Sequence, residues 1–194
     1  MLDELLQRRP IIVVLAGPNG AGKTTFFHAH LASAGLRFVN ADLLARELEL
    51  GPQQAMDIAD ALRVELIRQG ESFITETVFS DPVGAKLSLF TTAMAQGYTV
   101  VLLYIGVSGP ERCDERVAMR VSQGGHDVPT DRLITRYPRT LANLRAALPV
   151  LSAVLVYDND DLRRPYQLVA RIVQGHSEGL AAEPPAWWRG LRDQ

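Results

Sequence analysis

The sequence predicts an α/β fold in which helices cover both faces of a doubly wound, mostly parallel, five-stranded sheet. The apolar runs at 11–16, 98–105 and 153–157 have the composition of strands that are buried on both faces. Stretches with helical periodicity separate these runs, and strands that alternate with helices are typical of parallel sheets. Hydrophobic residues make up 47% and charged residues 22% of the 194 residues, which is a globular balance. We expect one domain over residues 1–194, with a C-terminal appendage over 163–194.

Glycines and prolines mark the bounds of the remaining elements. Two further strands are expected at 36–40 and 72–77. Helices are expected at 1–9, 23–34, 43–50, 53–68, 81–96, 110–123 and 130–148, the last with a kink at Pro138. The alternating polarity of 166–173, followed by Gly175, favours a terminal hairpin. Residues 184–194 are expected at the surface, with Trp187 and Trp188 either packing back or meeting a partner.

Composition also narrows the cellular setting. The net charge of −2 argues against bulk electrostatic capture of nucleic acid. The single cysteine, Cys113, rules out an internal disulfide framework and suits a reducing compartment. The first ten residues are too charged for a signal peptide, and no apolar run approaches the roughly eighteen residues that span a bilayer. The sequence therefore predicts a cytoplasmic protein.

Residues 17–24 form the motif G-x-x-x-x-G-K-T between a predicted strand and a predicted helix. In this setting the motif is a phosphate-binding loop, or P-loop, whose backbone N–H groups surround an anion at the start of a helix. Lys23 is expected to reach the β- and γ-phosphates of ATP, and the Thr24 hydroxyl to ligate Mg²⁺. The expected nucleotide-binding residues are Gly17, Pro18, Asn19, Gly20, Ala21, Gly22, Lys23, Thr24 and Thr25.

Two acidic residues follow strands that are predicted to end on the P-loop side of the sheet. Ligands of open parallel sheets bind beyond the carboxyl ends of the strands, which is where Asp42 and Glu76 are expected. Asp42 is the candidate to deprotonate an acceptor hydroxyl, and it is equally suited to cap the helix that starts at Leu43. Glu76 either holds Mg²⁺ through water, contacts the acceptor, or is a solvated strand-end carboxylate.

Two clusters of arginines are candidates to contact phosphates. Arg112, Arg116 and Arg120 recur every four residues and so share one helix face. They either clamp a phosphate-rich ligand or form a surface face neutralised by Glu111, Asp114 and Glu115. The weaker cluster comprises Arg132, Arg136 and Arg139.

With these residues the chain resembles the zeta-toxin family of P-loop kinases. The resemblance spans residues 11–160 and begins with the P-loop and Asn40-Ala41-Asp42. It continues through Phe73-Ile74-Thr75-Glu76-Thr77, Glu115-Arg116-Val117, Gly124-Gly125-His126-Asp127-Val128-Pro129 and Tyr157-Asp158-Asn159.

The resemblance implies an adenylate-kinase-like core that transfers the γ-phosphate of ATP to a hydroxyl of UDP-N-acetylglucosamine, and an antitoxin protein as a partner. The family's base falls on Asp42, its substrate-contacting acid on Glu76, with Thr77 beside it, and a phosphate-clamping arginine on Arg116. The second clamping arginine is one of Arg120, Arg132 and Arg136, with Arg136 also expected near the substrate. One departure is that Glu76-Thr77-Val78 stands where sugar-nucleotide kinases of this group have E-G-T.

Other P-loop classes fit less well. An ABC-transporter ATPase needs an LSGGQ-like segment, and residues 139–152 contain none; a GTPase needs an N-K-x-D guanine reader, which is also missing. A polynucleotide or tRNA kinase stays open because the arginine clusters could follow a phosphate backbone. A non-catalytic ATP-binding module stays open if Asp42 is only a helix cap.

Overall fold

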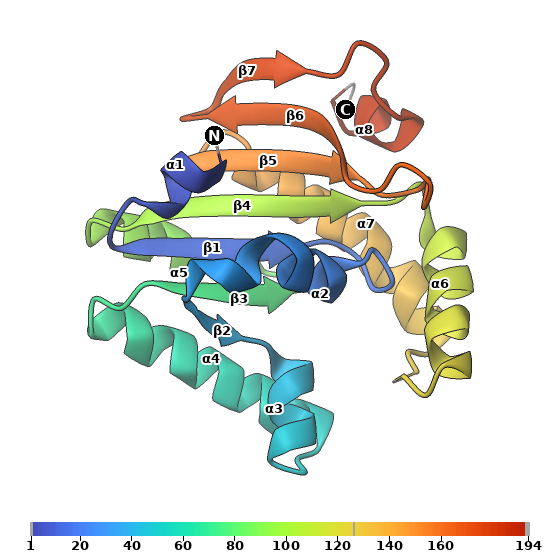
Figure 1. Cartoon of the computed structure of the whole chain (residues 1–194), viewed down its shortest axis with the longest axis horizontal. Coiled ribbons are helices and arrows are strands. Elements are labelled where there is room, and N and C mark those ends of the chain that lie inside the picture. Colours follow the sequence, from blue (N-terminus) through green and yellow to red (C-terminus); the bar gives the residue numbers. More distant parts are fainter. Residues whose placement is uncertain (1, 126, 193–194) are drawn as a thin grey trace.

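The chain folds around a seven-stranded sheet with the strand order β2-β3-β1-β4-β5-β6-β7 (Figure 1). The computed structural model describes residues 2–125 and 127–192. The strands are β1 (Ile11–Ala16), β2 (Arg37–Val39), β3 (Phe73–Thr77), β4 (Thr99–Gly106), β5 (Ala153–Asp158), β6 (Gln167–Val173) and β7 (His176–Leu180). Strands β1 to β5 pair in parallel, whereas β6 and β7 are antiparallel. The predicted parallel core is confirmed, and the predicted hairpin joins its edge, so that the sheet has seven strands instead of five.

The helices alternate with the strands as predicted. They are α1 (Leu2–Leu6), α2 (Lys23–Phe26), α3 (Ala41–Glu47), α4 (Pro52–Arg68), α5 (Ala85–Ala95), α6 (Pro110–Ser122), α7 (Thr130–Ala147) and α8 (Ala186–Arg192). The segment after α2 stays helical but changes pitch, with a π-helical stretch at Phe27–Leu31 and a 3₁₀ turn at Ala32–Ala34. The predicted helix over 23–34 is therefore present, and its hydrogen bonding changes along the segment from α-helical to π-helical to 3₁₀.

Two predicted helix starts were wrong. Helix α3 begins at Ala41 instead of Leu43, because the Asn40 side chain accepts hydrogen bonds from the Asp42 and Leu43 amides at 2.8 and 3.1 Å. Asn40 is thus the N-cap, and Asp42 lies in the first turn. Helix α5 begins at Ala85 instead of Asp81, whose carbonyl oxygen accepts a hydrogen bond from the Asn143 side chain of α7.

The sheet is buried on both faces, and β1 shows the alternation most clearly. Ile12, Val14 and Ala16 point into one apolar cluster, while Ile11, Val13 and Leu15 point into the other. The first cluster takes side chains from α4, α5 and α8, and the second from α1, α2 and α6. Helix α7 contributes to both clusters. This two-sided burial is why β1 reads as an unbroken apolar run.

The C-terminal tail lies at the surface, as predicted, with Ala186, Arg189 and Gly190 exposed, and its other side packs back onto the domain. Helix α8 buries Trp187, Trp188 and Leu191. The indole of Trp187 lies so close to the end of β4 that a Cβ atom on Gly106 would come within 2.3 Å of it. Of the two alternatives for the tryptophans, packing against the chain itself is confirmed.

The arrowheads of the parallel strands point to one side of the molecule, where α6 also lies (Figure 1). The loop after β1, the first turn of α3 and the end of β3 therefore meet at one edge of the sheet. Within residues 2–125 and 127–192, none of the helices combines the length and apolar character needed to cross a bilayer.

Candidate active site

The P-loop connects β1 to α2 and has its lysine folded over it. Lys23 is buried, and its Nζ atom donates a hydrogen bond to the carbonyl oxygen of Pro18 at 2.9 Å. The Oδ1 atom of Asn19 is also buried and makes no hydrogen bond within the part of the chain that is described. Because a buried polar atom without a partner is costly, this loop has the character of a site that is completed by a ligand.

Glu76, at the end of β3, accepts hydrogen bonds from two of the predicted site segments. Its Oε2 atom accepts from the Thr24 hydroxyl at 2.9 Å and from the Asn40 amide at 2.8 Å. Its other oxygen lies 3.9 Å from Lys23 Nζ. Asn40 therefore joins Glu76 to α3 while its other side-chain atom caps that helix. The P-loop, β2 and β3 meet at one carboxylate.

Asp42 is exposed at the mouth of this arrangement. Burial lowers the pKa of Lys23, while the carboxylates of Glu76 and Asp42 raise it. Burial likewise lowers the pKa of Arg136, as does Arg132, and Asp42 raises it. The Asp42 carboxylate thus interacts electrostatically with the P-loop lysine and with Arg136 of α7. Asp42 is also exposed, so a substrate can reach it.

The three arginines of α6 differ in their surroundings although they share a helix face. Arg112 is exposed and pairs with Glu115 at 2.8 Å. Arg116 donates to the backbone carbonyls of Asn159 and Asp160, the latter at 3.0 Å. Arg120 acts electrostatically on Lys23 and lowers its pKa. Arg112 therefore matches the neutralised surface face, and it also lies 3.6 Å from Asp160, in the loop that Arg116 contacts.

The remaining predicted site residues lie in the turn after β3, on α2 and on α7. The Thr77 hydroxyl accepts a hydrogen bond from the Phe79 amide at 3.0 Å and shapes the turn after β3. Thr25 is exposed on α2, next to the P-loop. Arg132 and Arg139 are exposed on α7. The loop residue His126, part of the resemblance, lies outside the described residues.

The sequence did not predict the residues that hold the P-loop and the end of β3 in place through hydrogen bonds to their backbone. Asn159, after β5, donates to the carbonyl oxygen of Ala21, and the Tyr166 hydroxyl donates to that of Gly22. The buried Arg63 of α4 donates to the Thr75 hydroxyl and to the Glu76 carbonyl oxygen, which fixes the end of β3. The motif Tyr157-Asp158-Asn159 was a signal for Asn159, but nothing in the apolar stripe of α4 pointed to Arg63.

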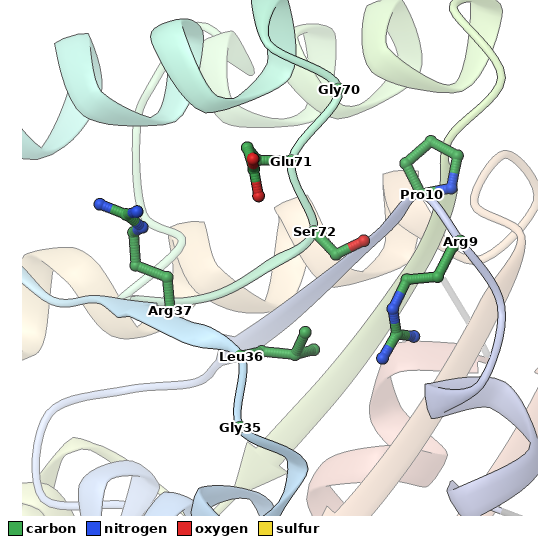
Figure 2. Close-up of a pocket in the computed structure, with 8 residues that line it drawn as sticks. All are labelled: Arg9, Pro10, Gly35, Leu36, Arg37, Gly70, Glu71 and Ser72. Atoms are coloured by element: carbon green, nitrogen blue, oxygen red, sulfur yellow. The ribbon is translucent and has the colours of Figure 1, made fainter.

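A separate hollow lies at the amino ends of β1, β2 and β3. Its lining includes Arg9, Arg37, Glu71 and Ser72, and Figure 2 shows Arg9 and Arg37 on opposite sides of it. The guanidinium of Arg9 donates to the backbone carbonyls of Leu6 and Arg8. This hollow is separated from the P-loop by the length of the strands and contains none of the predicted site residues.

Solved structures share this fold. Chains of the AvrRxo1-ORF1:AvrRxo1-ORF2 complex, solved with sulphate ions and with ATP, match with TM-scores of 0.71 and 0.64 at 18% and 17% identity. These matches cover 98% and 99% of this chain, which spans 66% of the length of those chains. A structure of the PezAT toxin-antitoxin system of Streptococcus pneumoniae matches with a TM-score of 0.60 at 15% identity, over 99% of this chain and 88% of that chain.

A third similar structure is a sugar kinase from Janibacter sp. HTCC2649, with a TM-score of 0.50 at 23% identity, over 81% of this chain and 88% of that chain. At these identities the likeness shows the fold alone, an α/β fold with a mostly parallel central sheet.

No curated protein matches the sequence. One family model does match: the family described as "AAA domain" covers residues 12–136, from the middle of β1 into α7. This range holds the P-loop, Asp42, Glu76 and all the candidate phosphate-contacting arginines of α6 and α7 except Arg139. Because the match extends over more than half of the chain, the protein is a member of this AAA-domain family.

Proposed function

We propose that the protein is an ATP-dependent kinase that transfers the γ-phosphate to a hydroxyl group of a small molecule. The observation that carries this proposal is the position of Asp42, an exposed carboxylate whose backbone amide donates to Asn40, which in turn donates to Glu76 beside the buried P-loop lysine. A carboxylate so placed is accessible to an acceptor hydroxyl that approaches the γ-phosphate. A P-loop that only bound ATP would need no such group.

The proposed reaction is an in-line displacement. The acceptor oxygen forms a bond to the γ-phosphorus, and the bond between that phosphorus and the β,γ-bridging oxygen breaks, which releases ADP. Asp42 accepts the proton that the hydroxyl loses, and Lys23 holds the charge of the β- and γ-phosphates. The chain thus contributes mainly position and positive charge, which is what phosphoryl transfer requires.

Thr24 and Glu76 fit a magnesium ion. Their oxygens lie 2.9 Å apart beside Lys23, and hydroxyl and carboxylate oxygens are ligands that Mg²⁺ prefers. Thr24 would hold the ion directly and Glu76 through water. When bound, the ion neutralises charge on the transferred phosphate.

The acceptor we favour is a UDP-sugar such as UDP-N-acetylglucosamine. The zeta-toxin resemblance supports this choice, as does the similarity in fold to a sugar kinase. The resemblance places Glu76 at the sugar, as an alternative to its magnesium role, with Thr77 beside it, and Arg136 would contact the diphosphate. Thr77 and Val78 depart from the E-G-T pattern, so the identity of the sugar rests on the family resemblance alone.

A protein partner of the antitoxin type is also proposed. The AvrRxo1 structures are complexes of two gene products, and PezAT is a toxin-antitoxin system. Co-purification of the protein with the product of an adjacent gene would test this.

The acceptor can be identified directly. Purified protein with MgATP and UDP-N-acetylglucosamine is expected to yield a product heavier by one phosphate in mass analysis, and the Asp42→Asn protein is the blank. RNA oligonucleotides with free hydroxyl ends are assayed in parallel. Phosphorylated RNA with an untouched UDP-sugar would favour a nucleic-acid kinase instead. No ATP turnover, even with cell extract, would place the protein among ATP-binding modules.

The arginines are expected to separate by role. Arg120→Ala and Arg136→Ala should each lower kcat by roughly a hundredfold or more, because both guanidinium groups act on charges at the site and can stabilise the transition state. The exposed Arg112→Ala is the control and should change kcat little. Arg116→Ala distinguishes two roles: a fall in kcat indicates a clamp, whereas a rise in KM for ATP alone indicates a brace for the loop after β5. Equal, negligible effects of Arg120→Ala and Arg136→Ala would contradict the proposal.

A further inference from the structure

The outer side of the P-loop is held by residues near the other end of the chain. Asn159 is 2% exposed, and its Nδ2 atom donates to the Ala21 carbonyl oxygen at 2.8 Å. Its Oδ1 atom accepts from the Tyr166 amide at 3.3 Å, and the Tyr166 hydroxyl donates to the Gly22 carbonyl oxygen at 3.0 Å. Asn159 and Tyr166 therefore form a bracket across two consecutive peptide units of the P-loop.

This bracket acts on the direction of the amides that would face a phosphate, at Ala21 through Asn159 and at Gly22 together with the Phe26 amide, which also donates to the Gly22 carbonyl oxygen at 2.9 Å. In a planar trans peptide the C=O and the following N–H point in opposite directions. Holding the carbonyls of Ala21 and Gly22 toward the bracket therefore turns the amides of Gly22 and Lys23 the other way, into the loop. The bracket also requires a glycine: at Gly22, where φ is +91°, a Cβ atom would lie 2.7 Å from Asn159 Nδ2 and 3.0 Å from the Tyr166 hydroxyl.

The bracket is in turn positioned by α8. The indole Nε1 of Trp187 donates to Asp158 Oδ1 at 2.7 Å, immediately before Asn159 in the chain. On the other side, Arg116 donates to the carbonyls of Asn159 and Asp160. The Asn159 amide also donates to the Gly106 carbonyl oxygen at 2.9 Å, beneath the Trp187 ring. Asn159 is thus held at its side chain and at both neighbouring peptides.

We propose that α8 is part of the nucleotide site, and that Trp187, acting through Asp158 and Asn159, is a positioning residue for the P-loop amides. This rests on the proposed function in one respect, namely that the amides bind the phosphates of ATP. The helix touches no reacting group. Its contribution is to keep the loop in its binding conformation in the free protein.

The two adjacent tryptophans of α8 provide a matched test. Trp187→Phe keeps an aromatic ring on Gly106 but removes the hydrogen bond to Asp158. Trp188→Phe removes a buried indole N–H that makes no hydrogen bond within the described residues. A second pair is Tyr166→Phe, which removes the hydroxyl on the P-loop, and Tyr157→Phe, which removes a hydroxyl from the same ring cluster around Phe26.

The readout is amide hydrogen exchange of a peptide spanning residues 17–26, in the free protein and with MgATP. In the free protein Trp187→Phe and Tyr166→Phe are expected to exchange several-fold faster than wild type, and Trp188→Phe and Tyr157→Phe at the wild-type rate. The dissociation constant for MgATP, measured by calorimetry, should rise about fivefold in the first two variants only. KM for the acceptor should stay unchanged in all four.

Equal exchange in Trp187→Phe and Trp188→Phe, with equal affinity for MgATP, would overturn the positioning role of α8. Faster exchange in both members of each pair would also overturn it, since that result reflects general loosening. If wild-type protein binds no MgATP while the exchange pattern holds, the bracket stands and the proposed kinase function fails.

Discussion

Lys23→Ala is expected to abolish phosphoryl transfer and to weaken MgATP binding by roughly ten- to a hundredfold. The substitution removes the cation that meets the β- and γ-phosphates, and a hydrogen bond to a charged group contributes about 1.5–3 kcal/mol. The fold should survive, because Glu76 keeps its hydrogen bonds to Thr24 and Asn40. Calorimetric titration with MgATP and a phosphoryl-transfer assay would measure the two effects.

The control is Lys86→Ala, since Lys86 is the only other lysine in the chain and pairs with Asp60 on α4. Asp60 also pairs with Arg63, which keeps its own hydrogen bonds to Thr75 and Glu76 in this variant. This variant should bind MgATP and turn over as wild type does, whatever its thermal stability. Unchanged affinity and persistent transfer in Lys23→Ala would mean that the loop does not bind the nucleotide as proposed.

Asp42→Asn is expected to leave ATP affinity near the wild-type value and to reduce the turnover rate by roughly a hundredfold or more. The amide has the size of the carboxylate but cannot accept the proton of the acceptor, and general bases contribute about 10²–10⁴ to rates. Stability should change little, because Asn40 and not Asp42 caps α3. Steady-state kinetics with calorimetry would separate binding from chemistry.

Asp131→Asn is the matched control, because Asp131 is likewise an exposed acid in the first turn of a helix, α7. Both substitutions remove a favourable interaction with a helix N-terminus, which is worth about 0.3–1 kcal/mol. Only Asp42→Asn should affect turnover. Full activity of that variant would leave Asp42 as a helix-end charge and favour a binding module.

The fold was predictable because its main signals are local. The apolar runs of β1, β4 and β5 and the P-loop between β1 and α2 identify a parallel sheet from short stretches of chain. The first residues of α3 and α5 were harder to predict from the sequence. Asn40 competes with Asp42 as a cap in the same tetrapeptide, and α5 starts only after Gly84, whose left-handed φ of +70° places it outside the helix.

The sequence predicted a residue of the candidate site only where a motif or the end of a predicted strand marks its position. Glu76 lies in the last residues of a predicted strand and Asp42 just after another, so sheet topology alone brings them near the P-loop. Arg63 lies in a helix whose other inward residues are apolar, and its buried contact with Thr75 has no local signature. The different surroundings of Arg112, Arg116 and Arg120 arise from their neighbours in the fold, because the spacing of the three residues is uniform.

The contacts of Asn159 and Tyr166 with the P-loop also bear on the order in which the protein is made. The two donors follow their P-loop acceptors by 138 and 144 residues, and Trp187 comes later still. A ribosome therefore releases the motif long before it releases the residues that hold the outer carbonyls of the loop. The nascent chain has the P-loop sequence early but acquires the finished loop only after Asn159, Tyr166 and Trp187 have been made.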